Sequence, residues 1–117
     1  MRKQKHKSYA ECPVEATLDL IGGKWKGIVL FHLMQGMQRF NELKRLIPGI
    51  TQRMLTLQLR QLERDGIVKR KVYKQVPPKV EYTLTALGLT LKPILEQLEQ
   101  WGTTHVLEPR LNGAITS

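Results

Sequence analysis

The chain has 117 residues, the size of one domain, and 41% of them are hydrophobic, which is enough for one modest core. Its 19 Lys and Arg against 10 Asp and Glu give a formal net charge of +9, which points to a polyanionic partner, either a nucleic acid or an anionic membrane surface. Because no apolar run approaches membrane-spanning length and no hydrophobic segment follows the charged N-terminus, we expect neither a signal peptide nor a membrane anchor, and a cytoplasmic location.

The chain begins with a basic stretch, MRKQKHKS. We expect residues 1–10 to form an N-terminal tail, which either reaches along a nucleic-acid backbone or is only a soluble tail. One folded domain is expected over residues 11–110, and a C-terminal tail over residues 111–117.

The only cysteine, Cys12, precedes Pro13, which suits the first position of a helix, so Cys12 is expected at the N-cap. A single cysteine excludes an internal disulfide and a cysteine-based metal cluster. A helix N-terminus favours a thiolate, which reacts with oxidants and electrophiles, and Lys7 lies nearby in the sequence. Cys12 is therefore either a redox sensor or only a small, half-buried residue. A sensor of this kind could form a disulfide to Cys12 of the partner subunit, or a mixed disulfide or adduct with a small molecule.

The segment GGKWKG lacks the spacing of a phosphate-binding loop and predicts a turn between two helices. In the helix after it, His32 shares an apolar stripe with Val29 and Leu33, which favours a partly buried histidine over a metal ligand. No nucleophile–base pair is evident along the chain. The sequence therefore predicts no metal site, no cofactor and no enzyme.

Residues 40–47 predict a short helix that a Pro-Gly pair ends. Pro48 cannot continue the hydrogen-bond ladder, and Gly49 can adopt the backbone angles that a tight turn requires. The apolar positions recur at spacings of three and four and line one stripe of the helix: Phe40, Leu43, Leu46 and Ile47.

The next helix is predicted to begin after the N-cap Thr51 and to end at Gly66. Its buried face is a stripe of leucines at helical spacing, centred on Leu55. A face rich in arginine opposite such a stripe is what a recognition helix presents to a DNA groove. Leu57 is unusual on that face, and could contact a thymine methyl group or pack against a neighbouring helix. At about 100° per residue, the residues opposite Leu55 are Arg53, Leu57, Arg60 and Arg64, with Thr56 at the border.

After Gly66 the apolar period changes from helical to alternating, in IVKRKVY and again in VEYTL. Val68 and Val72 alternate with lysines in the first of these segments. The connecting KQVPPK contains two prolines, which exclude a two-residue hairpin turn and hold the tip extended. A stiff, basic hairpin is suited to lying against a phosphate backbone.

A short helix, a Pro-Gly turn, a second helix with an arginine-bearing face and a basic hairpin thus follow one another. A basic helix face alone is usually only a solvated surface, but a solvated surface would not require this conjunction. The sequence therefore predicts a mainly α protein with a small β-hairpin wing, an α+β fold of the winged helix-turn-helix type that binds double-stranded DNA.

The segment TALGLTLKPILEQLEQW predicts a closing helix capped by Thr85, with a wide apolar face that a small domain hardly covers alone. Pro93 is expected to kink this helix. We expect the closing helix and the first helix to form a two-fold dimer interface; the alternative is that both close the core of the monomer. The expected interface residues are Val14, Leu18, Leu91, Leu95, Leu98 and Trp101.

With these elements in place, the sequence resembles the HxlR-type family of bacterial transcriptional regulators. The resemblance implies a homodimeric, cytoplasmic DNA-binding protein, commonly a repressor, and some members use a cysteine just ahead of the proline to sense quinones, aldehydes or disulfide stress. The matching segments are CPVEATLDLIGGKWKGIVLFHL, RFNELKRLIPGITQRMLTLQLRQLERDGIVKRKVY, PPKVEYTLTALG, and a closing helix that ends at Trp101-Gly102.

Members of this family use the helix after the IPGI turn for the major groove and the wing for the flanking backbone. Arg53 and Gln52 are then candidates for reading guanine and adenine, whereas the two threonines suit a phosphate or a thymine methyl group. Two-fold symmetry predicts a pseudo-palindromic operator with half-sites about one turn of DNA apart. The groove-facing candidates are Thr51, Gln52, Arg53, Thr56 and Arg60, and the wing candidates are Arg70, Lys74, Gln75 and Lys79.

Two rival interpretations stay open. A non-specific architectural DNA-binding protein needs only the positive charge. A dimerisation module that binds another protein would show no salt-dependent DNA binding. A small-molecule effector or an oxidant is a further possible partner, although the sequence reveals no small-molecule pocket.

Overall fold

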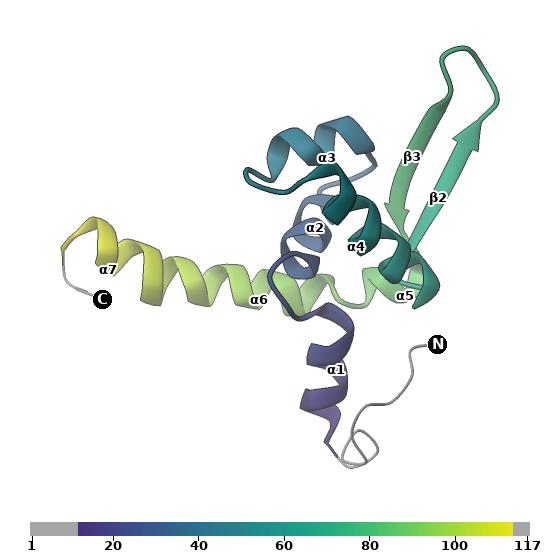
Figure 1. The fold of residues 1–117 in the computed structure, drawn as a ribbon. Coiled ribbons are helices and arrows are strands. Elements are labelled where there is room, and N and C mark those ends of the chain that lie inside the picture. The colour runs from purple at the N-terminus through teal and green to yellow at the C-terminus, as the bar shows by residue number, and fades with distance from the viewer. Residues whose placement is uncertain (1–11, 114–117) are drawn as a thin grey trace.

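A computed structural model describes residues 12–113 (Figure 1). Three helices, α2, α3 and α4, pack together at the centre, and the hairpin of β2 and β3 projects away from them (Figure 1). The predicted tail over residues 1–10, and Lys7 with it, lies outside the described residues. The elements are α1 (Pro13–Ile21), α2 (Lys26–Leu33), β1 (Gln38–Arg39), α3 (Phe40–Leu46), α4 (Gln52–Arg64), β2 (Val68–Tyr73), β3 (Lys79–Leu84), α5 (Ala86–Leu89), α6 (Lys92–Gly102), the π-helical segment η2 (Thr103–Leu107) and α7 (Glu108–Leu111).

A single cluster of aliphatic side chains forms the core between α2, α3, α4 and the root of the hairpin. Each fully buried leucine contributes about 2–3 kcal/mol relative to an exposed one, so this cluster is the main source of stability. The residues with almost no exposure are Val29, Leu30, Leu43, Ile47, Leu55, Leu59, Leu62, Ile67 and Val68.

The turn between α3 and α4 forms as its residues predict. The backbone of Ile47 is not helical, with φ −119° and ψ 87°. Gly49 has φ +88°, a backbone angle that residues with a Cβ rarely adopt. Thr51 then caps α4, because its Oγ1 accepts a hydrogen bond from the Met54 amide at 3.0 Å. Within the predicted apolar stripe of α3, Leu43 is buried and Leu46 is exposed.

The sheet has three antiparallel strands in the order β1-β3-β2. In the hairpin Val68 pairs with Leu84, and Val72 pairs with Val80. Val68 is buried at the root, whereas Val72 is exposed, because the hairpin extends beyond the helices that cover its base (Figure 1). Strand β1 was not predicted: its two residues are too short for any alternation, and it forms only by pairing with β3.

The C-terminal helix differs from the prediction in two ways. Thr85 caps a helix as expected, but this helix, α5, ends at Leu89, and Pro93 does not kink a continuous helix. Pro93 lies in the first turn of the separate helix α6, where its missing N–H is no loss. Helix α6 ends at Gly102, as the resemblance implies, but Gly102 has helical angles, φ −63° and ψ −41°, and the segments η2 and α7 follow it directly.

The remaining connection, between α1 and α2, is the turn predicted from GGKWKG. Helix α1 lies to one side of the core, and the rod formed by α6, η2 and α7 extends away from it on another (Figure 1). The fold is therefore mainly helical with a small antiparallel sheet, and the predicted winged helix-turn-helix class is confirmed.

Candidate nucleic-acid interface

The outer face of α4 is a polar surface with one apolar residue at its centre. The burial of Leu55, Leu59 and Leu62 determines how α4 is rotated about its axis, and so turns the arginine-bearing side to solvent. This side forms a shallow surface hollow of about 580 Å³. The structure brings together there the predicted candidates Gln52, Arg53, Thr56 and Arg60, and Leu57, which the sequence also places on this face.

The two threonines of the candidate set differ in their hydrogen bonds. Thr51 accepts from the Met54 amide, which leaves its own hydroxyl proton available to a phosphate. The Thr56 hydroxyl instead donates to the carbonyl oxygen of Gln52 at 2.9 Å. Thr51 is therefore the better phosphate donor, and Thr56 offers an acceptor oxygen and a methyl group.

Arg70 lies at the root of the wing and is tied to α4. Its Nε is 3.5 Å from Oε2 of Glu63, an ion pair between two partly exposed side chains. Such a pair is worth at most about 1 kcal/mol, but it lies where β2 meets the end of α4. Arg70 therefore contributes to the alignment of the wing with α4.

The other predicted wing residues lie along the hairpin and at its tip. Lys74 and Gln75 are exposed at the tip. Lys79 lies 4.3 Å from the centre of the Tyr73 ring, and its Nζ is 3.8 Å from Oε2 of Glu81. Because the Tyr73 hydroxyl donates to Oε1 of Glu81 at 2.9 Å, Lys79 is held in a small network and is less free than Lys74 to move toward a phosphate.

Arg39 is a basic residue that the sequence analysis missed. It is the N-cap of α3, where its amide donates to Oε1 of Glu42 at 2.7 Å. Its side chain lines a hollow of about 270 Å³ together with Gln75 and Lys79 of the wing. Arginine is not a usual capping residue, so only the capping partner Glu42, three residues later, could have marked this position in the sequence.

Burial shifts the pKa of two side chains, Tyr82 on β3 and His32 on α2. Burial raises the pKa of the Tyr82 hydroxyl on β3; the positive charge of Arg70 acts against this, Glu63 adds to it, and Arg60 acts against it. Charged residues of α4 and of the wing root thus both influence the pKa of Tyr82. Burial also lowers the pKa of His32, which favours the neutral imidazole. Within residues 12–113, no group of three His, Cys, Asp or Glu side chains is arranged to hold a metal ion.

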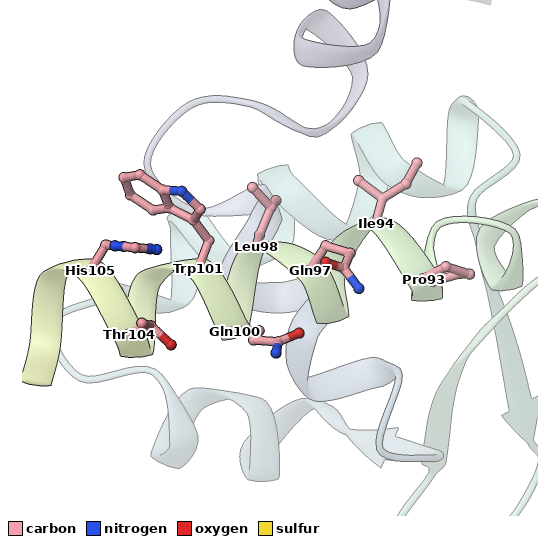
Figure 2. Close-up of a pocket in the computed structure, with 8 residues that line it drawn as sticks. All are labelled: Pro93, Ile94, Gln97, Leu98, Gln100, Trp101, Thr104 and His105. Atoms are coloured by element: carbon pink, nitrogen blue, oxygen red, sulfur yellow. The ribbon is translucent and has the colours of Figure 1, made fainter.

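Two further apolar patches lie on α1 and on α6, which leave the core on different sides (Figure 1). Val14 and Leu18 are exposed on α1, and Leu98 and Trp101 on α6. Figure 2 shows Leu98 and Trp101 projecting from the same side of α6, beside a hollow of about 770 Å³. Of the expected interface residues, Leu91 packs against the core, and Leu95 is only 4% exposed.

The assignment of Leu95 to an exposed interface is therefore wrong. It faces the monomer core because α6 packs on α2 at this point. Leu98 and Trp101, three and six residues later, lie on a side of α6 that α2 does not cover.

The model of the HxlR-like helix-turn-helix family matches residues 20–109, which include every element from α2 to η2. The chain belongs to the HxlR-like helix-turn-helix family. The resemblance predicted from the sequence motifs is thereby confirmed.

Proteins with close similarity to the chain are known from sequence and from structure. The chain is 67% identical over 94 residues to an HTH-type transcriptional regulator, YdeP of Bacillus subtilis, covering 80% of the chain and 73% of YdeP. It is also similar to the redox regulator HypR in its oxidised form, with 65% identity, a TM-score of 0.77, and coverage of 80% of the chain and 97% of HypR. For the reduced form of HypR the identity is 64% and the TM-score 0.79, with 83% and 98% covered.

The HxlR-like chain is thus a helix-turn-helix transcriptional regulator and not an enzyme, as the sequence predicts. Its partner is DNA. Among residues 12–113, no helix is both long and apolar enough to cross a membrane.

Proposed function

We propose that this HxlR-like protein is a cytoplasmic repressor that binds a pseudo-palindromic operator as a homodimer. The observation that carries the proposal is the exposed hollow on α4, in which two arginines and a glutamine lie beside a projecting basic hairpin. Arginine and glutamine can each make two hydrogen bonds to one base edge in the major groove. A protein that recognised only charge would not need this combination.

The proposed roles follow from position and hydrogen-bonding capacity. Arg53 and Gln52, in the first turn of α4, read bases, as residues near the start of recognition helices commonly do. Thr51 binds a phosphate through its free hydroxyl proton, next to the positive end of the α4 dipole. Arg60, Thr56 and the wing residues Arg70, Lys74, Gln75 and Lys79 contact the groove edge and the flanking backbone.

The homodimer is supported by the exposed apolar patches on α1 and on α6. Two protruding helices each expose two large apolar side chains, whereas surface residues of this kind usually occur singly. A second copy can cover them by the same surface, since a two-fold interface is self-complementary. The proposed interface residues are Val14, Leu18, Leu98 and Trp101, with Leu91 at its edge. Two recognition helices related in this way would read half-sites about one helical turn apart.

We also propose that Cys12 makes the repressor responsive to oxidants or electrophiles. Cys12 is the N-cap of α1, where its Sγ accepts a hydrogen bond from the Glu15 amide at 3.4 Å, and it is partly exposed. A structural relative at 65% identity is described as a redox regulator in oxidised form, which supports this reading. Two Cys12 thiols would give one intersubunit disulfide, losing two electrons and two protons to a peroxide that becomes water.

The test is a titration of the protein against DNA from upstream of its own gene, beside a shuffled duplex of equal length, at physiological salt. A preference of about a thousandfold or more supports a specific regulator. Equal binding to both favours the architectural interpretation or an operator elsewhere, and no salt-dependent binding favours a module that binds protein. For the redox response, the Cys12→Ser variant is compared with the unchanged protein after oxidant treatment. An equal loss of DNA binding in both would refute the role of Cys12.

A further inference from the structure

The exposed leucine at the centre of the α4 hollow is not explained by charge or by hydrogen bonding. We propose that Leu57 is a specificity-determining residue that recognises the C5-methyl group of a thymine in the major groove. This inference rests on the proposed function, because it requires α4 to enter that groove.

The structure places Leu57 in the middle of the polar face. Its side chain is 45% exposed and lines the same hollow as Arg53 and Arg60. It follows Arg53 by four residues and precedes Arg60 by three, so the three side chains form one stripe. The burial of Leu55 and Leu59 on the opposite side prevents α4 from turning Leu57 inward.

Single exposed leucines are common on protein surfaces, so exposure alone does not indicate a partner. What distinguishes Leu57 is the chemistry around it. A protein surface that covered Leu57 would also have to desolvate Arg53 and Arg60, which is costly unless each finds an anion. Double-stranded DNA supplies phosphates and guanine acceptors for the arginines, and in its major groove the base edges carry one apolar group, the thymine methyl.

Thr56 is the rival for the same contact, because it lines the same hollow and its side chain carries a methyl group. Its hydroxyl donates to the Gln52 carbonyl, so the side chain has no free proton to offer a base. Thr56→Ser removes only that methyl group and keeps the hydroxyl. A second matched control is Leu46→Ala, because Leu46 is also 45% exposed but lies on α3, outside the hollow.

The experiment begins with selection of duplexes from a random library by the full chain. Each thymine of the selected duplex is then replaced, one at a time, by deoxyuridine, which lacks only the methyl group. We expect one thymine in each half-site at which deoxyuridine weakens binding about three- to fivefold, the value of burying one methyl group. Leu57→Ala should bind the thymine and deoxyuridine duplexes equally, whereas Thr56→Ser and Leu46→Ala should keep the difference.

The possible results separate the two proposals. Failure to select any consensus would overturn the proposed specific regulator, and this inference with it. A consensus in which no thymine is sensitive to loss of its methyl group overturns the inference alone. A sensitivity that survives in Leu57→Ala, or that disappears in Thr56→Ser, assigns the contact to another residue and also overturns it. Equal helicity of the variants by circular dichroism, expected because Leu57 and Leu46 lie outside the core, excludes misfolding as the cause.

Discussion

Replacing Gly88 by alanine is expected to destabilise the root of the wing. Gly88 is buried in α5, and a Cβ at this position would overlap the carbonyl oxygen of Ile67 and lie 3.2 Å from Cβ of Leu84. The obstacle is backbone, which cannot rotate away as a side chain can. The carbonyl of Ile67 therefore has to move.

The size of the effect follows from the contacts of that carbonyl. It accepts a hydrogen bond from the Thr85 amide at 3.0 Å, worth about 1 kcal/mol. The single proton of the Thr85 hydroxyl, 3.1 Å away, is directed mainly to the Gly66 carbonyl oxygen at 2.6 Å and adds little. Overpacking at the site lowers the free energy of unfolding by about 1–3 kcal/mol, and the higher helix propensity of alanine raises it by about 1 kcal/mol. We therefore expect the free energy of unfolding to fall by about 1–3 kcal/mol and Tm by about 5–15 °C.

The assay is thermal and urea unfolding followed by circular dichroism, at one fixed protein concentration because association would shift the transition. Gly102→Ala is the matched control: it also lies in a helix with φ −63°, but a Cβ there meets nothing within 4 Å. This control should be more stable by about 0.5–1 kcal/mol. The reasoning is refuted if Gly88→Ala is as stable as the unchanged protein, or if both variants shift alike.

Four further outcomes are expected. Arg53→Ala should cost about 1–3 kcal/mol of operator binding and relax preference at one base pair, as measured by competition with single-base-pair variants; a uniform loss across all duplexes would argue against base reading. Lys74→Ala should weaken binding equally on all sequences and lower the slope of log K against log salt by about 1.8, because each phosphate contact is worth about 0.9 and the proposed homodimer carries two copies of Lys74; an unchanged slope would mean that Lys74 contacts no phosphate. Trp101→Ala should shift the protein from dimer to monomer in analytical ultracentrifugation. Trp101 is 61% exposed, which is about 150 Å² of surface, and covering this surface in a dimer would contribute about 4 kcal/mol of association free energy per protomer. An unaltered dimer would place the interface elsewhere. Burial lowers the pKa of His32, so the unfolded state binds a proton at this side chain more readily than the folded state does. The free energy of unfolding should therefore be highest above pH 6.5 and should decrease as the pH falls from 6.5 toward the pKa of His32 in the folded state. His32→Gln should flatten this part of the pH profile in urea unfolding, and an identical profile would contradict the prediction.

The parts of this protein that the sequence predicts correctly depend on near neighbours in the chain. The cap at Thr51 needs only the amide of Met54, and the turn at Gly49 needs only a residue that tolerates a positive φ. The outward face of α4 follows from helical period, because burying Leu55, Leu59 and Leu62 leaves one orientation for the arginines. The candidate DNA-binding surface of α4 could therefore be assembled residue by residue from local rules.

The features that the sequence does not reveal depend on contacts between distant segments. Strand β1 exists because Gln38 and Arg39 pair with β3, more than forty positions away, and that pairing also brings Arg39 to the wing. Leu95 and Leu98 are both apolar residues of one helix, and only the packing of α6 on α2 buries the first and exposes the second. Pattern and propensity identify which residues are able to be buried or paired; the three-dimensional packing selects which of them are, because burial is a property of what surrounds a side chain and not of the side chain itself.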